Sequence, residues 1–170
     1  MSAANDLHFA VTNAQVQILR FAQDDMRQLA FVVVLAMAAT SAHAQTAPAP
    51  DTTIIVRANT STLEFDPPKI SARQGTRVRI RFVNVGTLPH NFVLVRNEND
   101  IDDLAAAASK VGGDYVPLAQ KAKLIAFTTL ASPGQTVETT FVMPRPGEYT
   151  YVCLLSGHSN SMLGTLRSLK

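Results

Sequence analysis

Apolar and polar residues alternate along much of the chain from residue 52 onward. The clearest case is the segment 76–85, in which Val78, Ile80 and Phe82 alternate with three arginines. A period of two places the apolar side chains on one face of a strand and the arginines on the other, solvent-facing side. This pattern predicts a half-buried antiparallel strand. An anion-binding role for the arginine row is the less favoured alternative.

Other segments have the same strand character and are separated by residues that favour turns. A turn is expected at Phe65–Pro68, because two consecutive prolines do not fit inside a central strand. Turns are also expected at 74–75, 132–134 and 144–147, where glycine or proline interrupts the pattern. The remaining strands are predicted at 52–57, 70–73, 90–96, 124–131, 135–143, 147–154 and 163–169.

One segment differs from this strand pattern. Residues 99–113 combine early acidic residues with a run of alanines, then Lys110 and Gly112. Acids at the start, a base near the end and a terminating glycine predict a short helix, capped by Asn99 or Asp100. Residues 115–123 are expected to form a loop. Seven to eight short strands with one short helical insertion predict an all-β Greek-key β-sandwich.

The N-terminal part of the chain does not continue this pattern. Residues 26–44 have a short basic start, an apolar run and an Ala-x-Ala site, which together describe a secretory signal peptide. We expect cleavage after Ala44, with residues 1–25 a mis-called extension and Met26 the initiator. The alternative is an amphipathic leader whose apolar segment is retained as an anchor. Residues 45–50 are an Ala/Pro linker, and residues 51–170 form the expected domain.

Removing residues 1–44 changes the net charge and the number of histidines that remain. The 126 residues that remain (170 minus 44) carry 13 Lys and Arg against 10 Asp and Glu, a net charge of +3. This charge is small and scattered, and therefore gives no reason to expect nucleic-acid binding. The remaining histidines are His90 and His158, and Cys153 is the single cysteine. Cys153 cannot form an internal disulfide, so it is a buried filler, an intermolecular link or a ligand.

The neighbours of Cys153 favour the ligand. His158 and Met162 follow it within ten residues, and His90 lies upstream, before an asparagine. A thiolate, two imidazoles and a weak thioether are the donors of a mononuclear blue copper site. Taken one at a time, each histidine is also compatible with an ordinary turn or strand end, and the methionine with a core position. Their joint occurrence favours one copper ion, cycling between the cuprous and cupric states.

The chain resembles the cupredoxins, and azurin and auracyanin in particular. The resemblance extends from Thr52 to Lys170 and includes His90-Asn91-Phe-Val-Leu-Val, Pro-Gly-Glu-Tyr-x-Tyr-x-Cys153 and the spacing Cys-x4-His-x3-Met. It implies that His90, Cys153 and His158 are equatorial ligands and Met162 the axial ligand. It also implies that Asn91 ties the two ligand loops together.

Three departures from azurin concern the surroundings of the site. Pro89 stands where azurin has a glycine whose carbonyl approaches the metal, so we expect no backbone carbonyl ligand here. The azurin disulfide has no counterpart. Ser156 replaces the proline usual before Gly-His, which leaves the reduction potential unpredicted.

The resemblance implies one-electron transfer between redox partner proteins, which the sequence does not identify. Electrons would pass at the exposed edge of His158, through an apolar patch of Leu88, Pro89, Leu155 and Met162. We expect an exported, periplasmic monomer that meets a membrane only if the signal segment is retained. The alternative is a periplasmic copper delivery or storage protein on the same fold. A Cys153–His158 nucleophile and base is disfavoured, since no orienting third residue is evident, so we expect no enzyme.

Overall fold

The computed structural model describes residues 49–59 and 62–170. The predicted extension 1–25, the signal peptide 26–44 and the first residues of the linker lie outside this part of the chain. The described residues belong to one compact unit that ends at Lys170. In this unit, none of the described helices has both the length and the apolar character needed to span a membrane.

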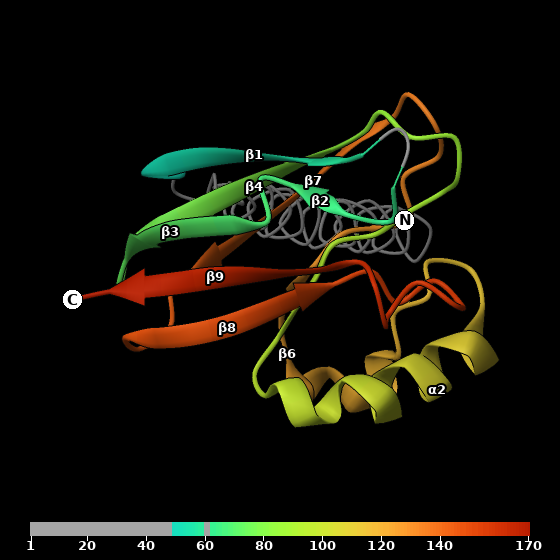
Figure 1. Ribbon diagram of the computed structural model, residues 1–170. Helices are drawn as coiled ribbons and strands as arrows, with labels where there is room; N and C mark the ends of the chain where they lie inside the picture. The colour runs from blue at the N-terminus through green and yellow to red at the C-terminus, as the bar shows by residue number, and fades with distance from the viewer. Residues whose placement is uncertain (1–48, 60–61) are drawn as a thin grey trace, which may run out of the picture. The chain divides into compact units, whose positions relative to one another are not determined.

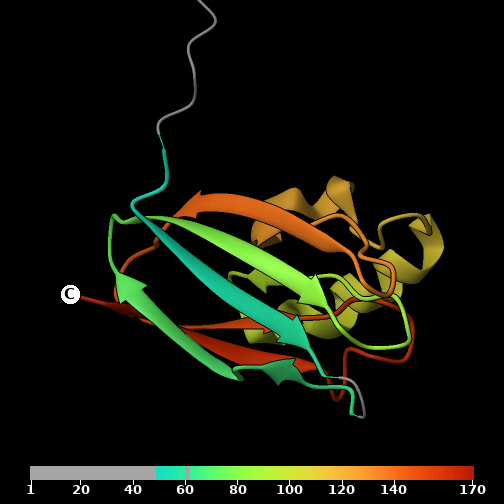
Figure 2. The same cartoon turned by 90° about the horizontal axis from the view of Figure 1, so that it is seen from above.

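Two sheets pack face to face (Figures 1 and 2). One sheet has the order β2-β1-β4-β7, and the other has the order β3-β9-β8-β5-β6. The pairs β1/β4 and β3/β9 are parallel, whereas the other neighbours are antiparallel. The strands are β1 (Thr52–Ala58), β2 (Phe65–Asp66), β3 (Lys69–Arg73), β4 (Arg77–Asn84), β5 (Val93–Val95), β6 (Leu124–Phe127), β7 (Thr136–Val142), β8 (Gly147–Val152) and β9 (Leu163–Leu169). The predicted all-β sandwich with one short helix is confirmed.

The alternation in β4 has the predicted consequence. Val78, Ile80 and Phe82 are fully buried between the sheets. On the outer face, Arg79 and Arg81 form ion pairs with Glu138 of the adjacent strand β7, at 3.5 and 2.9 Å. The arginine row therefore has a carboxylate partner within its own sheet, which supports the solvated-face interpretation.

Helix α2 (Ile101–Val111) covers part of the outer face of the five-stranded sheet (Figure 1). Its Leu104 and Ala108 pack in a second apolar cluster with Val95, Val152 and Leu154. Asp100, one of the two predicted caps, lies at the N-cap position of α2. Residues Glu98–Asp100 form a separate 3-10 turn, η1, and the side chain of Asn97 caps it by accepting a hydrogen bond from the backbone N–H of Asn99. Asp100 makes no capping hydrogen bond with its side chain.

Three predicted boundaries also differ from the structure. The expected turn at 65–68 begins with β2, which pairs for two residues with β1 before the prolines end it. The expected loop 115–123 contains a 3-10 segment, η2 (Leu118–Lys123). The expected strands 90–96 and 124–131 pair as a ladder only up to Phe127, and the register shifts between Leu94 and Val95. Beyond that point, His90 and Ala131 form an isolated bridge.

Candidate metal centre

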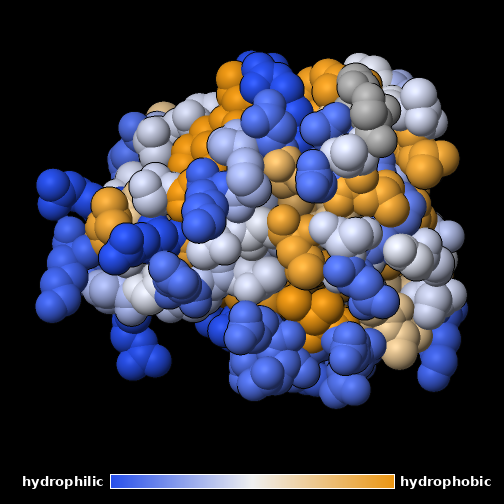
Figure 3. All heavy atoms as spheres, viewed as in Figure 1, coloured by the Kyte–Doolittle hydropathy of each residue, from blue (hydrophilic) through white to orange (hydrophobic). Residues whose placement is uncertain are grey.

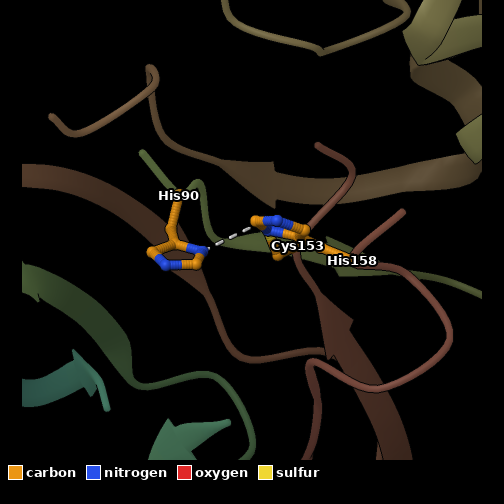
Figure 4. A group of neighbouring side chains, drawn as sticks. All are labelled: His90, Cys153 and His158. Carbon is orange, nitrogen blue, oxygen red and sulfur yellow. Dashed lines mark hydrogen bonds between the residues drawn. The ribbon is translucent and has the colours of Figure 1, made fainter. Parts of the chain in front are cut away.

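The four predicted ligands come from two connections at one end of the sandwich. His90 lies between β4 and β5, in the bridge with Ala131. Cys153 directly follows β8, and His158 and Met162 lie in the loop that leads to β9. Figure 4 shows the His90 ring facing Cys153 and His158, which overlap in this view. Segments 63 residues apart in sequence thus meet at the thiol.

The separations between the donor atoms fit a single ion. The Sγ atom of Cys153 lies 3.8 Å from Nδ1 of His90 and 3.6 Å from Nδ1 of His158. The ligand atoms of the three residues all lie within 4.8 Å of one another. Metal–nitrogen and metal–sulfur bonds of about 2.0 and about 2.3 Å, meeting at about 120°, place nitrogen and sulfur about 3.7 Å apart. A trigonal set therefore needs no rearrangement of the backbone.

Burial makes this a closed site. Cys153 and Met162 are fully buried, and His90 and His158 are 2% and 7% exposed. The loop folds back on itself, because the N–H of Met162 donates to the carbonyl of His158, and the N–H of Cys153 donates to the carbonyl of Met162. Met162 is thereby held beside Cys153, in the same apolar cluster.

Asn91 connects the segment of His90 to the segment of Cys153 by hydrogen bonds. Its side-chain oxygen accepts a hydrogen bond from the N–H of Leu154 at 2.9 Å, and its amide donates to the carbonyl of Asp114 at 2.8 Å. The carboxylate of Asp114 in turn accepts from the N–H of Leu130. The fully buried side chain of Asn91, the residue after His90, is therefore hydrogen-bonded to Leu154, the residue after Cys153.

The lowered pKa values of the two imidazoles favour binding of a cation. Burial, together with the neighbouring imidazole of His158, lowers the pKa of His90 to about 4. Burial also lowers the pKa of His158. Both rings are therefore neutral near pH 7, each with a nitrogen lone pair to share. A neutral imidazole can donate this lone pair to a metal ion, whereas a protonated imidazole would repel the ion.

Burial shifts the pKa of the Cys153 thiol in the opposite direction. Burial raises the pKa of Cys153, although N–H groups of Asn91 and Leu155 donate to its sulfur and oppose that rise. In the metal-free protein the thiol accordingly keeps its proton near pH 7. A bound cation would favour the thiolate, and the proton would then be released to solvent.

The neutral donors and the closed surroundings argue against a thiol nucleophile. Two surface hollows of about 320 and 360 Å³ lie over β3, β8 and β9. Neither is lined by His90, Cys153 or His158. A nucleophile and base need a cleft that admits a substrate, and neither of these hollows leads to the thiol.

The residues expected to form an apolar patch differ in exposure. Leu88 is 49% exposed, whereas Pro89 and Leu155 are partly buried. Ser156 and Gly157, which precede His158, are exposed. On the side of the domain shown in Figure 3, polar residues break the apolar surface into separate areas.

One buried polar residue near the site escaped the sequence-based prediction. Asn84 was included in the predicted strand 76–85 without a role, but its side chain is fully buried. The signal was present in the pattern. Asn84 occupies the inward register of Val78, Ile80 and Phe82, where an amide must find internal hydrogen-bond partners.

Known proteins are similar to this chain in sequence. The family described as copper binding proteins, plastocyanin/azurin family, matches residues 52–167. Auracyanin-A of Chloroflexus aurantiacus is 36% identical over 118 residues, which cover 67% of this chain and 72% of auracyanin-A. Auracyanin-B of the same organism is 34% identical over 122 residues, which cover 69% of this chain and 52% of auracyanin-B. The chain thus spans about half the length of that second relative.

A solved structure of auracyanin is similar to this chain as well. Auracyanin A, described as a "blue" copper protein from the green thermophilic photosynthetic bacterium Chloroflexus aurantiacus, aligns with a TM-score of 0.66 at 35% sequence identity. The alignment covers 69% of this chain and 98% of the solved chain. The sandwich, the clustered donors and these similarities agree, and the chain belongs to the plastocyanin/azurin family of copper-binding proteins.

Proposed function

We propose that His90, Cys153 and His158 hold one copper ion as equatorial ligands and that Met162 is its axial partner. The observation that carries the proposal is the meeting of one buried thiol and two neutral imidazoles within 4.8 Å. A thiolate with two imidazoles and a long thioether contact is the donor set of blue copper sites. The bound ion supplies one-electron redox chemistry, with cupric and cuprous states.

The function is the transfer of single electrons between redox proteins. Members of this family are electron carriers rather than enzymes. In this chain the ligands lie on a hydrogen-bonded loop and on a segment fixed by Asn91. Ligands held in this way move little when the charge of the ion changes, and small movement lowers the barrier to electron transfer. The residues keep water and competing ligands out, since the donors are buried.

Electrons would enter and leave at His158. His158 is the more exposed of the two histidine residues, at 7% against 2% for His90. Leu88, Pro89 and Leu155 would form the apolar contact around it. A net charge of only +3 after signal cleavage suits docking through apolar contact more than long-range steering. The redox partners are therefore proteins that present an apolar surface of their own.

Copper delivery or storage is the competing function on the same fold. A delivery site has to release its ion to an acceptor, and a closed site with four donors is poorly suited to that. Cyclic voltammetry with a copper-acceptor assay separates the two functions. Fast, reversible voltammetry with no copper loss to a chelating acceptor supports the electron carrier. Slow voltammetry with rapid transfer of copper supports delivery and rejects our proposal.

Export is part of the same proposal. Residues 26–44 have the features of a signal peptide, and residues 51–170 contain the nine described strands of the sandwich. We propose that the protein matures by cleavage after Ala44 and acts as a periplasmic or otherwise exported monomer. N-terminal sequencing of the exported protein tests this, and a mature start upstream of Met26 would contradict it.

A further inference from the structure

Asn84 ends β4 at the point where the chain leaves the sheet toward His90. The regular ladder stops there, and the next strand, β5, begins only at Val93. The segment between them pairs with its neighbour through the isolated bridge between His90 and Ala131 and through Phe92, whose carbonyl accepts from the N–H of Thr128 at 2.9 Å. Something other than a strand ladder must therefore hold this segment in place.

The side chain of Asn84 supplies three hydrogen bonds to the segment and its neighbour. Its amide nitrogen donates to the carbonyls of Leu88 at 2.7 Å and Ala131 at 2.8 Å. Its oxygen accepts from the N–H of Gly86 at 3.0 Å. Both donors of the amide and its acceptor are used, so the group is fully satisfied although it is completely buried.

The carbonyl of Ala131 is the point where this network reaches a ligand. It accepts the N–H of His90 at 3.0 Å as well as the amide of Asn84. The carbonyl of Leu88, the other acceptor, lies two residues before His90 in the chain. Asn84 thereby fixes the backbone of His90 from two directions.

Gly86 leaves the space that this packing requires. A Cβ atom there would lie 3.0 Å from the carbonyl oxygen of Asn59, 3.3 Å from Oδ1 of Asn84 and 3.6 Å from Nε2 of His90. The backbone at Gly86 is therefore enclosed by the Asn84 side chain on one side and lies near the His90 ring on another. The amide and the imidazole are parts of one packed unit.

We infer that Asn84 is a positioning residue for the copper centre, which holds His90 in ligand geometry through Leu88 and Ala131. The inference rests on the proposed copper site, and it concerns a residue whose side-chain hydrogen bonds go to the backbone of Leu88, Ala131 and Gly86. Asn91 fixes the backbone around Cys153, and Asn84 does the same for His90 from the opposite sheet.

The first test uses the metal-free protein, so it does not depend on copper. In wild type, the N–H of His90 and the side-chain amide of Asn84 should exchange slowly with solvent by NMR. In Asn84→Asp, which keeps the shape but loses both donors, and in Asn84→Ala, exchange at His90 and Ala131 should rise about tenfold or more relative to the β8/β9 ladder. Free exchange of these groups in wild type would overturn the inference without any variant.

Ser168→Ala is the matched control. Ser168 is 4% exposed and its hydroxyl donates to the carbonyl of Pro144 at 2.8 Å, so this variant also removes a buried hydrogen bond. Ser168 pairs with Gly147, which begins β8, whereas Cys153 follows the other end of that strand. The control should lower thermal stability but leave the His90 amide protected relative to the rest of the sheet.

The second test uses the copper-loaded protein. Asn84→Ala should shift the reduction potential and the copper hyperfine splitting, and it should speed copper loss about tenfold or more. Ser168→Ala should change none of the three. If the Asn84 variants match the control in potential, splitting and loss rate, the positioning role is wrong. A wild-type protein that never turns blue contradicts the proposed function instead, and the exchange test then still decides the role of Asn84.

Discussion

The side-chain oxygen of Asn91 accepts a hydrogen bond from the backbone N–H of Leu154 at 2.9 Å. These two residues follow His90 and Cys153 in the chain. The bond therefore sets the spacing between an imidazole and the thiol through the backbone, before any metal arrives. It also explains why ligands from different parts of the chain meet with suitable separations.

Asn91→Ala should weaken both the fold and the site. The change leaves the carbonyl of Asp114 and the N–H of Leu154 without their partner. The expected cost is about 1–3 kcal/mol in the free energy of unfolding, measured with urea, together with weaker copper binding. Asn97→Ala removes a cap at the exposed turn η1 and serves as the control. Equal copper affinities in the two variants would contradict the linking role.

His158→Gly should open the proposed site at its more accessible side. Removing the ring leaves a space beside the sulfur of Cys153 that a free imidazole can fill. Copper-loaded His158→Gly should lose the native visible band, and added imidazole should restore it. Wild type under the same additions is the control. A variant that keeps the native colour and electron-exchange rate without imidazole would rule out His158 as a ligand.

The metal-free protein should lose stability as the pH falls from about 6.5 to about 4. The pKa of His90 is lowered to about 4 in the folded state, from 6.5. The unfolded chain therefore takes up a proton in this interval that the folded chain refuses. The loss is about 3 kcal/mol, at about 1.4 kcal/mol for each unit of pKa difference. Below about pH 4 both states carry the proton, and this contribution falls no further.

An NMR titration of the His90 ring measures that pKa directly. A midpoint near 4 agrees with burial beside a second imidazole, whereas a midpoint near 6.5 would contradict it. His158 should shift in the same direction. Unfolding by urea at each pH then gives the matching change in stability.

Gly164→Ala should be strongly destabilising. A Cβ atom at Gly164 would overlap the ring of Tyr151, which lies across it on the neighbouring strand. Tyr151 is fully buried, stacks on Phe92 and donates to the carbonyl of Pro67 at 2.7 Å, so it has no easy alternative position. We expect a loss of about 3 kcal/mol or more in thermal or urea unfolding.

Gly134→Ala is the control for that substitution. A Cβ at Gly134 would meet nothing within 4 Å, and its φ of +79° leaves only backbone strain. That strain corresponds to about 1 kcal/mol. A smaller loss in Gly164→Ala than in Gly134→Ala would show that Tyr151 moves freely.

The pattern of residues predicted the sandwich because most strands have one buried and one solvent-facing side. The pattern did not predict the strand boundaries correctly where tertiary contacts determine the backbone conformation. His90 and Asn91 read as the start of a strand, yet they leave the regular ladder because their side chains serve the site. Similarly, β2 exists only because β1 lies beside it for two residues.

The candidate ligands were predictable because each is a rare residue type in the chain. Cys153 is the single cysteine, and the resemblance matched each of the others to a motif. Asn84 was not predicted, since asparagine is common and its partners lie on two different segments. Its inward register in β4 was the available sign.

The visible spectrum of the cupric protein tests the central claim most directly. With one equivalent of cupric ion, wild type should show an intense thiolate-to-copper band, and Cys153→Ser should bind without it. The serine hydroxyl is a hard donor and gives no such band. A colourless wild-type protein, or a Cys153→Ser variant that stays blue, would contradict a blue copper centre built on His90, Cys153 and His158.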